Sequence, residues 1–385
     1  MGAVVRRGTC AAAALAALAL VLAWSAARVH YANGGNWTAL FCSGAGVPLP
    51  PQLDAVTYRV PLVGYDGQFY RLLAHDPILR KGYARYADAP QYRFRRSLVP
   101  WLAWLVAWGN DRWIDTAYIA TEMLFIALGT YWCARLLGRR GRSPWWGLLF
   151  LAVPATIASI DRMVVDAPLT AWFVGFLLYS EEERWARVWV LAALAGLTRE
   201  TGLLIAAALV AGRLLQRDWR AAAGFAACAI PSLAWFEYLA RHLPASQSIP
   251  EIGFPFWNLF ARLLIFRTYF NPLGQVVLRT LDLLAVLGLI ASVAVAAGWL
   301  RHAKTGPVSL CVALYASLAV VLGPPVMFDP FAFGRVISPL LVWILIEAVS
   351  RKNWAAWAPP LAITLNASLV FARPMITIGQ ALLRR

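Results

Sequence analysis

The sequence predicts an all-α polytopic membrane protein with about eleven transmembrane helices and a long first outer loop. Of the 385 residues, 61% are hydrophobic and 14% are charged. Soluble domains have about 45–50% apolar and about 25% charged residues. The mean hydropathy of +0.61 also indicates a membrane protein. This composition excludes a soluble enzyme, a disordered regulator and a disulfide-rich secreted protein.

The charge distribution indicates which partners to expect. The chain has 35 Lys and Arg against 19 Asp and Glu, a net charge of +16. Most basic residues stand in short clusters between apolar segments, as membrane topology requires. We therefore expect anionic membrane lipids, and no nucleic acid, as partners.

The first apolar segment, residues 9–27, follows Arg6 and Arg7. Its end, residues 25–27, resembles a cleavage site, which leaves a signal peptide as an alternative. The segment is longer than the apolar part of a signal peptide, so we expect an uncleaved first helix. The two arginines keep the N-terminus in the cytoplasm.

A long polar stretch, residues 28–112, is the predicted first outer loop. Within it, the apolar segment 98–109 is too short to cross a bilayer of about 30 Å. If it crossed, the basic cluster in residues 135–142 would lie outside, against the positive-inside rule. We predict that residues 98–109 form a juxtamembrane helix.

The later apolar segments are expected to cross the membrane alternately. They are residues 113–137, 144–160, 163–180, 188–197, 202–215, 221–240, 281–300, 308–324, 336–349 and 354–371. Each short inner connection then carries at least two basic residues, as the positive-inside rule requires. An amphipathic stretch, residues 256–266, is expected on the surface. The chain divides into a module of residues 1–215 and a helical module of residues 216–385 with outer loop 241–279.

Ionisable residues at short span ends are costly in a membrane, so they are candidate site residues. The first group is Asp66 with Tyr65, Gln68 and Tyr70. Asp66-Gly67 is a turn signal, and the apolar residues that follow have helical spacing. We expect the Asp66 carboxylate at the start of a surface helix, either in a capped turn or at the mouth of a membrane cavity.

A second group is Asp161, Arg162 and Asp166. Asp161 and Arg162 form the predicted connection between two spans, and Asp166 lies one turn into the second. Asp166 follows Arg162 by four residues, so the two can pair on one helix face. The pair either joins the two helices or belongs to the site.

The remaining candidates are Arg199, Glu200 and Arg335. Arg199 and Glu200 interrupt the apolar stretch 188–215, which predicts a hairpin of two short helices that line a cavity. The alternative is that Arg199 and Glu200 only neutralise each other as an ion pair. Arg335 opens a span from the outer side. Arginine suits a phosphate ligand, and snorkelling to a lipid headgroup is the other interpretation.

Common catalytic motifs are missing from the sequence. It has no Walker loop, dinucleotide fingerprint, Gly-x-Ser-x-Gly, His-Glu-x-x-His or Cys-x-x-Cys. Its four histidines do not cluster. We expect no cofactor and no metal site, with a divalent metal left as an alternative.

The pattern as a whole resembles the membrane-embedded glycosyltransferases of the C superfamily. Within them it is most similar to the polyprenyl- or dolichyl-phosphate-mannose-dependent mannosyltransferases. Residues 65–70 resemble their Trp-Asp-Gly-x-x-Tyr, residues 94–101 their aromatic stretch before a proline helix, and residues 197–202 a later Arg/Thr-Gly element. Tyr65 replaces the tryptophan, and only residues 98–100 remain of Phe-Pro-Leu-x-Pro. The resemblance covers roughly residues 1–215.

The resemblance implies inverting transfer of a mannose-like sugar from a polyprenyl-phosphate donor. The acceptor would be a glycan, lipid or protein on the extracytoplasmic face, in a bacterial inner membrane. Asp66 would be the base, with Asp161 or Asp166 orienting the site. The substrate and its phosphate would be held by Arg96, Arg199, Glu200, Arg335, Tyr65, Gln68 and Tyr70. Asp76 and Asp88, in the same loop as Asp66, are expected to take no part.

Three alternatives stay open on the sequence: a lipid-linked glycan flippase or transporter, a surface-glycan polymerase or ligase, and a non-catalytic scaffold. A transporter needs polar residues along a path through both halves of the membrane. In the cytoplasmic half of the predicted spans, the sequence places few ionisable residues apart from Glu347.

Overall fold

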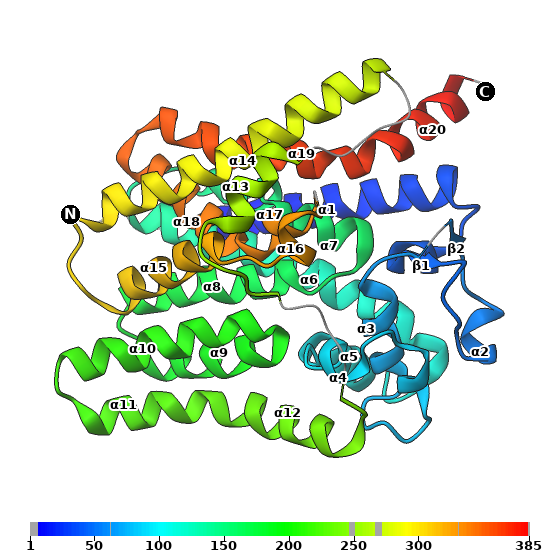
Figure 1. Ribbon diagram of the computed structural model, residues 1–385, viewed down its shortest axis with the longest axis horizontal. Coiled ribbons are helices and arrows are strands. Elements are labelled where there is room, and N and C mark those ends of the chain that lie inside the picture. The colour runs from blue at the N-terminus through cyan, green and yellow to red at the C-terminus, as the bar shows by residue number, and fades with distance from the viewer. Residues whose placement is uncertain (1–6, 62, 246–250, 266–271, 330, 384–385) are drawn as a thin grey trace.

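The computed structural model describes residues 7–61, 63–245, 251–265, 272–329 and 331–383. The fold is all-helical, with 77% helix, which confirms the predicted class. The strands β1 (Ser43–Gly44) and β2 (Arg59–Val60) form one short parallel pair in the first loop. Figure 1 shows the long helices lying side by side, with the short elements of that loop gathered at one end.

Five helices in the described ranges are long and apolar enough to cross a membrane, and one bent pair makes a sixth candidate. The bent pair is η3 (Pro144–Ala152) and α7 (Pro154–Arg162), which meet at 63°. The five are α1 (Arg7–Ala32), α6 (Asp111–Arg139), Trp219–His242, Gly274–Leu300 and Trp354–Leu383. These helices support a membrane protein, and the count of eleven spans stays a prediction.

Of the other three candidates, two take up several labelled elements and one is a single helix. They are α11 (Trp219–Ala226), η5 (Ala227–Ala229) and α12 (Ile230–His242); α14 (Pro272–Leu300); and η6 (Trp354–Trp357), α19 (Ala358–Ser368), η7 (Leu369–Phe371) and α20 (Ala372–Leu383). The last of them continues beyond residue 371, where the sequence predicted its end.

The other predicted spans are also helical but shorter. They are α8 (Asp166–Glu181), α9 (Trp185–Thr198), α10 (Leu203–Leu215), α15 (Pro307–Val320) and α18 (Ser338–Arg351). Prolines in the first turns of α15 and α18 suit helix starts, because these positions need no N–H donor. α8 and α18 pack together and are buried over most of their length, so they form the centre of the bundle.

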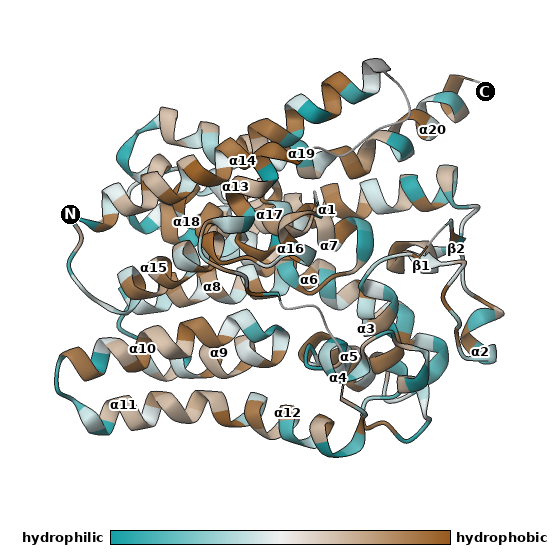
Figure 2. Ribbon diagram, viewed as in Figure 1, coloured by the Kyte–Doolittle hydropathy of each residue, from teal (hydrophilic) through white to brown (hydrophobic). Residues whose placement is uncertain are grey.

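The central helix α6 packs against α1, α8 and η3. A Cβ on Gly129 would lie 2.3 Å from the Phe150 ring, and one on Gly147 would lie 2.6 Å from Ala134. The two glycines therefore let α6 and η3 approach closely, as small residues do between membrane helices. Figure 2 shows the helices α9, α10 and α14 mainly in hydrophobic colours.

The first loop folds into short helices: η1 (Trp37–Phe41), α2 (Pro51–Asp54), α3 (Gly67–His75), η2 (Tyr83–Tyr86), α4 (Pro90–Arg93) and α5 (Leu98–Val106). The expectation of a surface helix after Asp66 is wrong, because all nine residues of α3 are buried. α3 packs against α5 and α6. α5 forms at the predicted juxtamembrane segment and exposes Leu105 and Val106.

The second outer loop contains α13 (Trp257–Leu264), and the later connection between α15 and α18 contains α16 (Pro324–Met327) and α17 (Ala332–Val336). α13 lies within the predicted amphipathic stretch 256–266; residue 266 is outside the described ranges. It exposes Trp257, Phe260 and Leu264 and buries Arg262. The connection between α15 and α18 brings Arg335, on α17, to Asp66 of the first loop.

Candidate functional site

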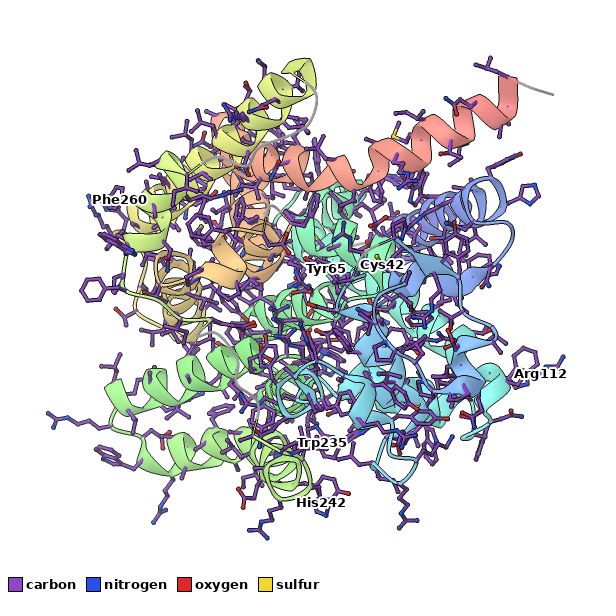
Figure 3. The ribbon with its side chains drawn as sticks, turned by 45° about the vertical axis from the view of Figure 1, so that its right-hand side comes forward. Cys42, Tyr65, Arg112, Trp235, His242 and Phe260 are labelled. Atoms are coloured by element: carbon purple, nitrogen blue, oxygen red, sulfur yellow. The ribbon has the colours of Figure 1, made fainter. Side chains whose placement is uncertain are left out.

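Charged residues from distant parts of the sequence meet in the middle of the molecule. Figure 3 shows Tyr65 near the centre, between the first loop and the C-terminal helices, whereas Arg112 and His242 lie at the edges. Around Tyr65 the structure brings together Asp66, Asp166, Arg199 and Arg335, all buried. Residues on both sides of position 215 therefore build one site.

Asp66 precedes α3, but its side chain makes no capping hydrogen bond, so the capped-turn interpretation is wrong. Its Oδ1 accepts a hydrogen bond from Nη1 of Arg93 at 2.7 Å, and its Oδ2 accepts one from Nη2 of Arg335 at 2.7 Å. Arg96 Nη1 lies 3.7 Å from Oδ2. Burial alone would raise the pKa of Asp66, but Arg335, Arg93 and Arg96 outweigh it and hold the pKa well below its usual value. Asp66 is therefore ionised at neutral pH.

Asp166 begins α8 and pairs with two arginines from other helices. One carboxylate oxygen contacts Arg199, and the other accepts a hydrogen bond from Nη1 of Arg335 at 3.0 Å. The predicted pair with Arg162 is wrong. Met163 adopts a left-handed conformation (φ 46°), which ends α7 before α8 begins and removes the four-residue helical spacing.

Arg96 and Glu200 form a bidentate pair. Nε and Nη2 of Arg96 donate to Oε2 and Oε1 of Glu200 at 3.1 and 2.6 Å, and Nη1 donates to the Tyr70 hydroxyl at 2.5 Å. Burial would raise the pKa of Glu200, but Arg96 and Arg199 outweigh it and lower the pKa to about 2. Arg199 and Glu200 do form an ion pair, with 3.9 Å between Nε and Oε1, but each has a closer partner, Asp166 for Arg199 and Arg96 for Glu200. Arg199 has an extended backbone between α9 and the turn η4 (Glu200–Gly202), which separates the two short helices α9 and α10.

Asp161 lies beside this centre and not in it. Its Oδ1 is 2.7 Å from Nη1 of Arg28 on α1, and its Oδ2 accepts a hydrogen bond from Arg162 at 3.1 Å. The Arg162 guanidinium stacks on the Tyr65 ring, with 4.2 Å between its Cζ and the ring centroid. Asp161 therefore supports Tyr65 through Arg162.

Gln68 has both ends of its amide occupied by the backbone. Nε2 donates to the Val63 carbonyl at 2.9 Å, and Oε1 accepts from the Gly44 N–H at 3.0 Å. The side chain ties the first loop together where the sequence predicted a substrate contact. Tyr65 differs, because its hydroxyl donates to Asp329 at 3.0 Å inside the site.

Several site residues escaped the sequence analysis: Arg93, Tyr92, Glu251 and Asp329. Arg93 Nε and Nη2 donate to the two oxygens of Asp88 at 2.9 and 2.8 Å, so Asp88 does take part. The three-residue spacing of Arg93 and Arg96, either side of the end of α4, is the signal that could have identified Arg93. Tyr92 contacts both Arg96 and Glu251. Asp76 instead accepts two backbone N–H bonds within its own loop.

Three cavities adjoin these residues. The central cavity, about 430 Å³, is lined by Asp66, Arg93, Arg199 and Arg335. The apolar cavity, about 380 Å³, shares Arg199 with it and continues along Leu318, Leu322, Val326 and Val336. The loop cavity, about 460 Å³, lies on the other side of Asp66 and is lined by Tyr65, Asp66, Gln68, Phe69, Tyr86 and Arg93. Asp66 thus borders both a cavity rich in arginine and a cavity within the first loop.

The described part of the chain contains no group of three or more His, Cys, Asp or Glu side chains placed to hold a metal ion. In the site itself, the carboxylates of Asp66, Asp166 and Glu200 all face guanidinium groups. These groups favour an anionic ligand, because arginine forks fit phosphate oxygens.

The chain matches no protein-family model, no curated protein and no solved structure. Function is therefore inferred from the geometry and the charges of the site.

Proposed function

We propose that the chain is an integral membrane glycosyltransferase that moves a mannose-like sugar from a polyprenyl-phosphate donor to a hydroxyl acceptor on the extracytoplasmic face. One observation carries this proposal: the ionised Asp66 lies between a cavity lined by arginines and a separate loop cavity. A carboxylate in that place is within reach of two substrates that approach from opposite sides. In this proposal the helices make eleven spans, with the N-terminus in the cytoplasm.

The donor fits the central and apolar cavities. Arg199 and Arg335 line the central cavity and present guanidinium groups for a phosphate. The adjoining apolar cavity offers Leu318 and Leu322 to the start of a prenyl chain. Asp166 contacts both arginines and so fixes their positions. An anionic head and an apolar tail are therefore accommodated side by side.

The acceptor fits the loop cavity, which Asp66 also borders. The acceptor oxygen forms a bond to the anomeric carbon, and the bond between that carbon and the phosphate oxygen breaks. The phosphate leaves with the electron pair, and the hydroxyl proton passes to Asp66, which acts as general base. Attack from the side opposite the phosphate inverts the anomeric configuration. Arg199 and Arg335 stabilise the charge that develops on the phosphate.

A proton-coupled transporter of lipid-linked glycans is the second candidate, favoured by Glu122. This residue lies within α6 and is fully buried; among the described residues its carboxyl oxygens face no cation, and the polar side chain that interacts with them is Ser159. Buried carboxyl groups in membrane helices often serve proton relays. In a transporter Glu122→Gln stops translocation of a fluorescent lipid-linked glycan across proteoliposomes; in the proposed transferase it leaves sugar transfer within a few-fold.

The transferase is tested in proteoliposomes with radiolabelled mannosyl polyprenyl phosphate and a bacterial membrane lipid extract as the source of acceptor. Asp66→Asn keeps the shape of the side chain but removes the base, so transfer should fall by about 10²–10⁴-fold. Donor binding should persist, because Arg199 and Arg335 are unchanged. Glu347→Gln, which alters an arginine-paired carboxylate elsewhere in the fold, is the matched control and should transfer normally. Normal transfer by Asp66→Asn would refute the proposed role.

A further inference from the structure

The two oxygens of Asp66 are held by arginines in different situations. On Oδ2, Arg335 is only 7% exposed in its side chain and also pairs with the buried Asp166. On Oδ1, Arg93 is 20% exposed and also pairs with Asp88, whose side chain is 52% exposed. Of these two arginines, Arg93 is the one that pairs both with Asp66 and with a largely exposed second carboxylate.

The cavities distinguish the two arginines in the same way. Arg93, Asp66 and Asp88 line both the central cavity and the loop cavity, so the ion pairs among them form a wall between the two. Arg335 lines the central cavity. A ligand in the loop cavity therefore meets Asp66 at the side where Arg93 holds it.

The cost of breaking each pair also differs. Separating Asp66 from Arg335 would leave Nη2 of a buried guanidinium group without its partner, where solvent cannot replace the lost hydrogen bond. Separating Asp66 from Arg93 leaves Arg93 bonded through two nitrogens to Asp88, with its guanidinium 5.0 Å from the centre of the Phe69 ring. Oδ1 is therefore the oxygen that can be freed at lower cost.

We propose that Arg93 is a positioning residue that yields Oδ1 of Asp66 to a hydroxyl of a neutral sugar or polyol acceptor in the loop cavity, while Asp88 retains Arg93. The inference rests on the proposed function, since it assigns an occupant to the cavity beside the base. Tyr65, Phe69 and Tyr86 give this cavity the aromatic surface that sugar rings pack on. Until the acceptor arrives, Asp66 stays paired and does not act as a base.

The rate at which a reagent modifies the Asp66 carboxyl group measures how strongly Arg93 pairs with it, and this measurement needs no transfer assay. A water-soluble carbodiimide with glycinamide modifies protonated carboxyl groups, and mass spectrometry of peptides locates the product. The titratable and charged groups that face Asp66 are Arg93, Arg96, Arg335, Tyr65 and Tyr70. Removing Arg93 takes away one positive neighbour and should shift the titration of Asp66 upward by about one to three pH units.

Purified full-length protein is labelled between pH 4 and 7. Arg93→Ala should raise the rate of Asp66 labelling at least tenfold, because one pH unit is a tenfold change in the protonated fraction. Arg93→Lys, which keeps the charge, should restore most of the protection. Arg85→Ala is the matched control: Arg85 lines the same cavity but bonds to Tyr86, so Asp66 labelling should not change.

Asp88→Asn separates this role from a purely structural one. If Asp88 receives Arg93 on release, its loss tightens the hold of Arg93 on Asp66, and labelling stays at or below the wild-type rate. If Asp88 merely props Arg93 against Asp66, labelling rises as in Arg93→Ala, and the proposal is overturned. Unchanged labelling in Arg93→Ala overturns it too, even where Asp66→Asn abolishes transfer. The expected labelling pattern together with normal transfer by Asp66→Asn would instead refute the proposed function alone.

Discussion

Two networks of arginines and carboxylates join distant helices in this fold, and they differ in burial. At the end of α6, Arg140 pairs with Glu347 of α18 at 2.7 Å and with Glu181 of α8, and the three side chains are 14–35% exposed. Around Asp66, the side chains of Asp66, Asp166, Arg199 and Arg335 are 1–11% exposed. Partly exposed ion pairs each contribute about 0–1 kcal/mol, whereas buried ones carry a large desolvation cost. The Arg140 network is thus an ordinary set of ion pairs that connects helix ends. The Asp66 network carries a large desolvation cost, and a functional role accounts for it better than a stabilising role does.

The predicted topology places the Arg140 network on the cytoplasmic side of the membrane and the Asp66 network on the outer side. Finding both networks on the same side would contradict this difference most directly. Single cysteines are placed at Ser143, close to Arg140, and at Gln91, close to Arg93. In intact cells an impermeant thiol reagent should label Gln91→Cys and leave Ser143→Cys unlabelled, an all-or-none difference. The unsubstituted chain gives the baseline for its five cysteines. Labelling of Ser143→Cys from outside would contradict the topology and remove the extracytoplasmic site.

Substitution of one arginine in each network gives the next largest difference. In the proposed function Arg335 makes a charged hydrogen bond to the donor phosphate, worth about 1.5–3 kcal/mol, so Arg335→Gln should weaken polyprenyl-phosphate binding about tenfold or more. Arg140→Gln should leave that binding unchanged. Arg335→Lys should restore it only in part, because lysine lacks the bidentate fork. Equal binding by the Arg335 and Arg140 variants, measured with labelled polyprenyl phosphate, would show that Arg335 is structural.

The smallest expected effect is on stability against pH. The folded pKa of Asp66 lies below its usual value of about 3.9, so the stability it contributes is complete above that value and is lost as the pH falls. The difference in unfolding temperature between wild type and Asp66→Asn in detergent should therefore stay constant from pH 8 to about 5 and shrink below about pH 4. A difference that grows at acid pH would show that Asp66 is not held ionised.

The sequence predicted the helices better than their surroundings. Every predicted apolar segment is helical, because apolar runs of this length must satisfy their backbone groups internally. The burial of α3 was missed, since its polar residues, including Arg71 and His75, are paired with Asp115 and Asp111 across the loop. Such partners lie tens of residues away and leave no local periodic signal.

For the site, the sequence identified the residue types but not their pairing. Asp66, Asp166, Arg199 and Arg335 stood out because charge is costly near a membrane. Their partners depend on how the helices pack. Local spacing gave one wrong pair, Arg162 with Asp166, and it missed Asp166 and Arg96 as the closer partners of Arg199 and Glu200. Arg93 and Glu251 were missed because a polar loop offers no contrast against which a functional charge can be recognised.

The hydrogen bond between Asp66 and Arg335 joins residues that are 269 positions apart in the sequence. During synthesis, Asp66 is therefore made well before its partner. At about 5–20 residues per second, the ribosome needs roughly 13–54 seconds to reach Arg335 after Asp66 has emerged. Through that interval the growing chain carries an acid whose final counter-charge has not been made, and only Arg93 and Arg96 are available to it. The nascent protein therefore has the proposed base before it has Arg335, and nonsense mutations as late as α16 would yield a chain that lacks this part of the charged centre.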